Sequence, residues 1–224
     1  MKLSKLLLSL LLAIVPSYIQ AADYTPLRSV VYPVMVHEAP GPRTTSTVVS
    51  SGSAVMIDKG YALTAAHVVP PTPQQVMYIV NGRQSFIATP VKIDRDRDLA
   101  LLSVQLNCPC ATLAVHPPKL DDPVIAIGYP MYLNYQLEFV TLGNLQGWYE
   151  GNLVSTASTA PGGSGGGLFW KDGTVYRLVG VTVAIATAPI GPHMLNIEQE
   201  RSWIAFSVPS STIHAFLNGT PVAH

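Results

Sequence analysis

The sequence has few residues that could form the disulfides or metal sites that stabilise a small protein without a large core. It contains two cysteines, Cys108 and Cys110, whose spacing along a strand would strain a disulfide between them. Histidines or further cysteines at metal-ligand spacing are lacking around this pair, so we expect no metal and no cofactor. Apolar residues make up 48% of the chain. We therefore expect a fold held together by apolar burial.

Charge is also scarce. Charged residues account for 12% of the chain, and the formal net charge is zero. This balance gives no electrostatic basis for binding nucleic acid or an anionic membrane, and we predict neither as a partner.

A long apolar run is missing as well. The stretch over residues 6–15 is too short to cross a bilayer, and no comparable run recurs later. It follows two lysines and precedes a pair of alanines, which is the order of a secretory signal peptide. We therefore expect residues 1–22 to be a signal peptide, and the remainder to be secreted or periplasmic with no stable membrane anchor.

Helical periodicity is nearly absent, whereas short apolar and β-branched runs are frequent between turn-forming residues. This pattern predicts an all-β protein. A short terminal helix is the exception, with Ser210 or Ser211 as its cap and Ile213, Phe216 and Leu217 on adjacent turns. The predicted strands are 30–36, 48–57, 76–80, 86–91, 99–104, 124–127, 137–142, 153–156, 175–186 and 204–208.

Three segments, 63–68, 94–102 and 160–167, combine strand-edge positions with reactive side chains. They supply a histidine, an acid and a serine in that chain order, the set that activates a serine nucleophile. We predict Ser164 as the nucleophile and His67 as the general base.

Three aspartates compete for the role of the acid that orients the histidine. We predict Asp98, because it directly precedes an apolar run that would bury its carboxylate at the start of a strand. Asp94 and Asp96 are expected at the surface.

Glycines occupy five of the six positions from 162 to 167, around Ser164. A serine nucleophile needs backbone N–H groups that converge on the developing oxyanion, and side chains obstruct such a tight turn. We predict that Gly162 and Ser164 donate these N–H groups. Because glycine loses much entropy on ordering, we expect the oxyanion hole to form fully only with substrate bound.

Two alternatives remain open. The pattern Gly162-x-Ser164-x-Gly166 also fits the nucleophile elbow of a secreted esterase, although such enzymes have their acid and histidine after the serine. The second alternative is a catalytically silent peptide-binding module on the same scaffold.

The segments Thr64-Ala65-Ala66-His67, Asp98-Leu99-Ala100-Leu101-Leu102 and Gly162-Gly163-Ser164-Gly165-Gly166 resemble the catalytic blocks of trypsin-like serine peptidases, and most of all the HtrA (Deg) branch. The resemblance implies two six-stranded antiparallel barrels and a secreted serine endopeptidase that acts on a protein or peptide. The expected domains are an N-terminal barrel over 23–118, a C-terminal barrel over 119–218 and a tail over 219–224. We expect no PDZ domain.

The resemblance also implies where substrate binds. A peptide would pair with the strand over 181–185 and contact Val183, Ala184 and Ile185. Ser158 would lie near the base of the primary pocket, with Ile185 on its wall. Because no acid is placed there, we expect small or medium apolar residues before the cut.

Overall fold

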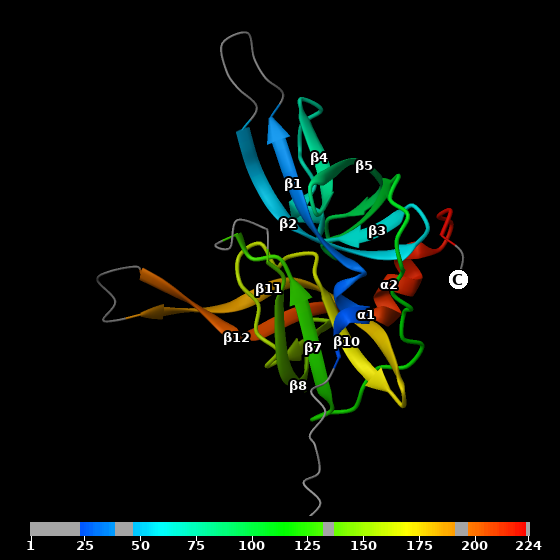
Figure 1. Ribbon diagram of the computed structural model, residues 1–224. Coiled ribbons are helices and arrows are strands. Elements are labelled where there is room, and N and C mark those ends of the chain that lie inside the picture. Colours follow the sequence, from blue (N-terminus) through cyan, green and yellow to red (C-terminus); the bar gives the residue numbers. More distant parts are fainter. Residues whose placement is uncertain (1–22, 39–46, 132–136, 191–196, 223–224) are drawn as a thin grey trace, which may run out of the picture.

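The computed structural model describes residues 23–38, 47–131, 137–190 and 197–222 (Figure 1). The predicted signal peptide, residues 1–22, lies outside the described residues. The elements are α1 (Thr25–Arg28), β1 (Val31–Glu38), β2 (Thr47–Asp58), β3 (Tyr61–Thr64), η1 (Ala66–Val68), β4 (Gln75–Asn81), β5 (Gln84–Asp94), β6 (Leu99–Val104), β7 (Pro123–Gly128), β8 (Phe139–Tyr149), β9 (Asn152–Ser155), β10 (Gly167–Asp172), β11 (Val175–Ile190), β12 (Ile197–Pro209) and α2 (Ser210–Leu217).

The strands form two closed barrels. The first has the order β1-β2-β3-β6-β5-β4 and the second the order β10-β11-β12-β9-β8-β7, with antiparallel pairing between the named strands. Figure 1 shows the two barrels beside each other, with the long β11–β12 hairpin extending away from the second. The prediction of two six-stranded barrels with a short C-terminal helix is confirmed. The exact limits of the two domains stay predictions.

Each strand run predicted from the sequence overlaps a strand of the structure. The runs do not include β3, whose four residues are too few for an apolar pattern to mark it. β10 is indicated in the sequence only by the apolar residues 168–170, and in the structure it begins on the last glycine of the loop around Ser164.

Strands at the junction of the barrels bury both of their faces. On β6, Ala100 and Leu102 point into the first barrel, whereas Leu99 and Leu101 pack against the second barrel and α2. Successive side chains of a strand point to opposite faces, so a strand buried on both sides must be apolar throughout. This explains the continuous apolar run after Asp98.

Two apolar clusters join the barrels. One contains Leu63, Leu99, Leu101, Val181, Val208 and four residues at the C-terminal end of the described chain, Ile213, Phe216, Leu217 and Val222. The other contains Leu27, Val30, Val31, Val55, Ile125, Ile127, Phe169 and Leu178. Both draw side chains from the two barrels, so apolar side chains of the two barrels pack against each other in both clusters.

The C-terminal helix α2 covers this interface with the side chains predicted for it, Ile213, Phe216 and Leu217, which are all buried. The predicted caps were wrong. Pro209 occupies the N-cap position without a side-chain hydrogen bond, and Ser210 is the first helical residue. Ser210 is buried directly after β12, and its packing takes precedence over the capping preference of serine.

Cys108 and Cys110 are unpaired and half-buried in the segment between the barrels. In the described part of the chain, no helix is long and apolar enough to cross a membrane. Nor do three or more histidine, cysteine or acidic side chains gather there as a metal site.

We expect Leu101→Ala to lower the free energy of unfolding by about 2–5 kcal/mol, because it removes a fully buried side chain from the interface between the barrels. Leu120→Ala is the matched control, since that leucine is 62% exposed. Urea unfolding of both variants measures the difference. Equal losses in the two variants would contradict the role given to the interface.

Candidate active site

His67 lies on a turn that holds its backbone and leaves its ring accessible. β3 ends at Thr64, and the short helix η1 follows, with Ala66 and Val68 almost fully buried on either side of the histidine. The small side chain of Ala66 lets the turn pack closely against the barrel. The side chain of His67 is 50% exposed.

The Asp98 carboxylate contacts His67 at two points. One carboxylate oxygen lies 2.7 Å from the ring Nδ1, and the other accepts the His67 backbone N–H at 2.9 Å. The Asp98 carbonyl accepts the N–H of Ala66 at 3.2 Å. Asp98 has φ of 53°, a left-handed conformation that aspartate adopts more readily than most residues. These contacts fix both the position and the rotation of the imidazole ring.

The pKa of Asp98 reflects two opposing effects. Burial raises this pKa most strongly, but the hydrogen bonds from the ring and backbone of His67, together with the attraction to the His67 ring, outweigh burial. The net effect holds the pKa of Asp98 below its ordinary value. The side chain therefore stays an ionised carboxylate, which accepts hydrogen bonds, at neutral pH.

The other two aspartates of this segment do not contact His67. Asp94 accepts hydrogen bonds from the backbone and the guanidinium of Arg97, at 3.0 Å and 2.7 Å, within its own turn. Asp96 is exposed. Of the three candidates, the structure brings Asp98 to the histidine.

The loop that carries Ser164 is held at each of its carbonyl groups from Pro161 to Ser164. Each of these four oxygens accepts a hydrogen bond. In chain order, the donors are the N–H of Met131 at 2.9 Å, the hydroxyl of Ser53 at 2.9 Å, the N–H of Gly166 at 2.9 Å and the N–H of Ser53 at 2.7 Å. The main chain of this loop therefore needs no substrate to hold its shape, contrary to the expectation from its glycine content.

The N–H groups of this loop alternate in their use. Those of Gly163 and Gly165 donate to the carbonyls of Ala160 and Thr182, each at 2.7 Å. Within the described residues, the N–H groups of Gly162 and Ser164, each of which directly precedes one of these donors, donate to no backbone carbonyl. Because the C=O and N–H of a trans peptide point in opposite directions, fixing each carbonyl also fixes the direction of the following N–H. The two N–H groups are thus oriented and unused.

Glycine is required at two positions of this loop. Gly162 has φ of 93°, and a Cβ there would lie 2.5 Å from the backbone nitrogen of Met131. Gly165 has φ of 86°, and a Cβ there would collide with the Ser53 carbonyl and the Thr64 hydroxyl. Neither position could carry a side chain without moving the loop.

The first barrel brings the histidine and the serine loop close to each other. A Cβ built on Gly52 of β2 would lie 2.7 Å from the side chain of Val68 and 3.0 Å from the Ser164 carbonyl oxygen. Val68 directly follows His67, so the two segments approach the same point of β2. In the described structure, no hydrogen bond joins the Ser164 hydroxyl to the His67 ring.

A cavity of about 190 Å³ opens beside Ser164. It contains the predicted substrate-binding residues Val183, Ala184 and Ile185. The other lining residues are Thr182, which lies within the strand predicted to bind the peptide, and three that sequence reasoning missed, Thr159, Ala160 and Pro161. These three directly precede the glycine loop, and this closeness in sequence to Ser164 was the signal that could have identified them.

Ser158 does not line the cavity that contains Ser164. It borders a neighbouring space of about 10 Å³, roughly the size of one water molecule, which shares Thr159 and Thr182 with that cavity. In the structure, Ser158 therefore borders a space next to the cavity beside Ser164.

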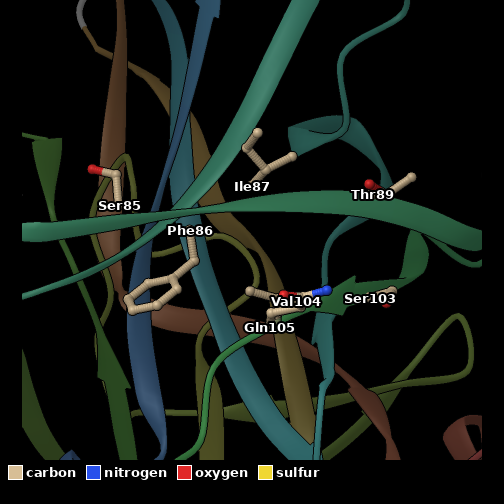
Figure 2. Close-up of a pocket in the computed structure, with 7 residues that line it drawn as sticks. All are labelled: Ser85, Phe86, Ile87, Thr89, Ser103, Val104 and Gln105. Atoms are coloured by element: carbon tan, nitrogen blue, oxygen red, sulfur yellow. The ribbon is translucent and has the colours of Figure 1, made fainter.

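A second hollow, of about 620 Å³, lies on the first barrel (Figure 2). Phe86 and Ile87 point to opposite sides of β5 there, as neighbours on a strand do. The hollow is lined by Ser85, Phe86, Ile87, Thr89, Ser103, Val104 and Gln105. None of these side chains is charged or titratable near neutral pH, and none is a predicted site residue.

Comparison with known proteins agrees with this geometry. The family model described as "Trypsin-like peptidase domain" matches residues 52–181. The chain is 31% identical over 174 residues to a "Probable periplasmic serine protease do/HhoA-like" of Haemophilus influenzae, covering 71% of this chain and 34% of that protein. It is 30% identical over 172 residues to the "Periplasmic pH-dependent serine endoprotease DegQ" of Escherichia coli, covering 71% of this chain and 35% of that protein.

The fold is also similar to a solved structure, the serine endoprotease from Yersinia pestis. The TM-score is 0.66 at 25% sequence identity, over 88% of this chain and 65% of the other. The chain spans about a third of the length of the two curated relatives. The resemblance seen in the sequence is confirmed: the chain belongs to the trypsin-like peptidase family and is similar to its HtrA/Deg serine endoproteases.

Proposed function

We propose that this protein is a secreted or periplasmic serine endopeptidase in which Ser164 is the nucleophile, His67 the general base and Asp98 the orienting acid. The observation that carries the proposal is the two-point contact between Asp98 and His67. The family, the periplasmic relatives and the predicted signal peptide support it.

The contact with Asp98 defines the chemistry of the histidine. Because the carboxylate accepts a hydrogen bond from Nδ1–H, the neutral ring presents Nε2 as a lone-pair acceptor. Nε2 takes the proton of the Ser164 hydroxyl while its oxygen attacks the carbonyl carbon of the scissile peptide bond. The imidazolium that forms is stabilised by the ionised Asp98, and it then protonates the leaving amine. Water releases the acyl group by the same steps in reverse order.

The oriented N–H groups of Gly162 and Ser164 serve as the oxyanion hole in this proposal. They are the two loop N–H groups that donate to no backbone carbonyl in the described part of the chain. Negative charge develops on the carbonyl oxygen of the substrate as Ser164 attacks. Donors that are already in place stabilise this charge without a cost of reorganisation.

The substrate would lie along β11, where Val183, Ala184 and Ile185 line the cavity beside Ser164. An extended peptide can add to a strand edge through main-chain hydrogen bonds, which makes binding largely independent of side chains. Side-chain selectivity then depends on the cavity, and no charged residue lines it.

A catalytically silent peptide-binding module would not be labelled at Ser164 by a serine-directed inhibitor. We expect a peptidyl phosphonate to label the wild-type serine covalently and to leave Ser164→Ala unlabelled, as measured by intact mass. A casein or fluorogenic peptide assay on the same two samples tests turnover. A wild-type protein that is folded, unlabelled and inactive would favour the silent module.

We expect Asp98→Asn to lower kcat by roughly four orders of magnitude, because the amide would hold the wrong imidazole tautomer. Asp94→Asn is the control, since Asp94 pairs with Arg97 and not with His67. Steady-state kinetics of the two variants, each checked for folding by circular dichroism, measure the effect. An equal loss in Asp94→Asn would mean that the orienting acid is misassigned.

We expect the wild type to cut after small or medium apolar residues and to reject lysine and arginine, which would bury an unpaired charge in the cavity. Ile185→Gly should widen the cavity and raise relative cleavage after larger residues by roughly tenfold or more, the effect of one to a few methylenes. Profiling both proteins on one random peptide library measures the preference. Dominant cleavage after lysine by the wild type would refute this placement of the cavity.

A further inference from the structure

We propose that Ser53, a first-barrel residue outside the predicted triad, is a positioning residue whose hydroxyl holds the oxyanion loop in its active conformation. The inference rests on the proposed function, since it concerns the same reaction. Sequence reasoning gave no sign of this role because Ser53 lies 109 residues from Gly162.

Ser53 is fully buried on β2 and uses each of its polar groups. Its N–H donates to the Ser164 carbonyl at 2.7 Å, and its carbonyl accepts the Thr64 hydroxyl at 2.7 Å. Its hydroxyl donates to the Gly162 carbonyl at 2.9 Å and accepts the Tyr129 N–H at 2.8 Å. One residue of the first barrel thus holds two separate segments of the second.

The hydroxyl matters because of where its two partners lie. Gly162 and Ser164 are the residues whose unused N–H groups form the proposed oxyanion hole. The Gly162 carbonyl, which the hydroxyl binds, belongs to the peptide that joins the two peptides carrying these N–H groups. The hydroxyl also fixes Tyr129, whose own carbonyl approaches Gly162 closely. The segment 129–131 holds the other side of the loop through the Met131 N–H.

Glycine makes this support necessary. Gly162 has no Cβ, so both positive and negative φ are accessible to it, and its present φ is 93°. The Ser53 hydroxyl and the Ala160 carbonyl together hold the peptide between Gly162 and Gly163. Without the bond from the hydroxyl, one of these two restraints is lost, and rotation of this peptide would displace the neighbouring peptides that carry the Gly162 and Ser164 N–H groups. The Ser53 N–H, which any residue except proline would supply, holds only the peptide after Ser164.

Ser53→Ala removes the two hydroxyl bonds and keeps both main-chain bonds of the residue. We expect kcat to fall roughly 10- to 100-fold, less than the 100- to 1000-fold loss typical of deleting an oxyanion donor itself. KM should stay within about threefold, because the substrate strand and cavity are unchanged. Inhibition by a peptidyl boronic acid, whose tetrahedral oxygen occupies the oxyanion hole, should weaken by a factor similar to that in kcat/KM.

Thr64→Val is the matched control, because it removes a different hydroxyl bond to the same residue, on the Ser53 carbonyl, and keeps the bond to Gly162. We expect it to reduce stability to urea but to leave kcat within about threefold. Should Ser53→Ala fail to fold, Ser53→Cys replaces it, since the thiol is a weak hydrogen-bond donor of similar size.

The outcomes separate clearly. A selective loss of kcat and of boronic acid affinity in the Ser53 variant supports the proposal. An unchanged kcat, or an equal loss in Thr64→Val, overturns it, because either result would make Ser53 a purely structural residue. A wild-type protein without activity or phosphonate labelling would instead count against the proposed function.

Discussion

The apolar interface between the two barrels is the constraint on which the remaining structure depends. Strands such as β6 bury one face inside their own barrel and the other against the neighbouring barrel. Such a strand is held from both sides, and its ends are therefore fixed in position. Asp98 directly precedes β6, and His67 follows shortly after its neighbour β3. The interface thus provides rigid support for the contact between these two residues.

Polar contacts across the same junction are few and specific. The fully buried Ser53 links the first barrel to the loop around Ser164, and the buried Thr64 hydroxyl donates to the Ser53 carbonyl within the first barrel. A buried hydroxyl without a partner is costly, so a satisfied network of this kind favours one arrangement of the barrels over nearby alternatives. Apolar packing brings the barrels together, and these hydrogen bonds determine how the serine loop lies against the histidine segment.

The glycine loop illustrates how context changes a local tendency. Its composition alone indicates a flexible segment, because glycine loses more conformational entropy on ordering than other residues. In the fold, each carbonyl from Pro161 to Ser164 accepts a hydrogen bond, and side chains at Gly162 or Gly165 would collide with neighbouring groups. The absence of side chains therefore permits close packing of the main chain instead of producing mobility.

The sequence by itself determined the strand runs and the all-β class, and it predicted Ser164, His67 and Asp98 as the reactive residues. Those features depend on local patterns: alternating or continuous apolar positions, glycine beside a serine, and an aspartate before an apolar strand. The tertiary structure alone decided that Asp98 reaches both the ring and the backbone of His67, that Ser158 borders a space next to the cavity beside Ser164, and that the Ser53 hydroxyl binds the Gly162 carbonyl. These contacts join residues far apart in the chain or depend on the exact course of the backbone, and no local pattern encodes them.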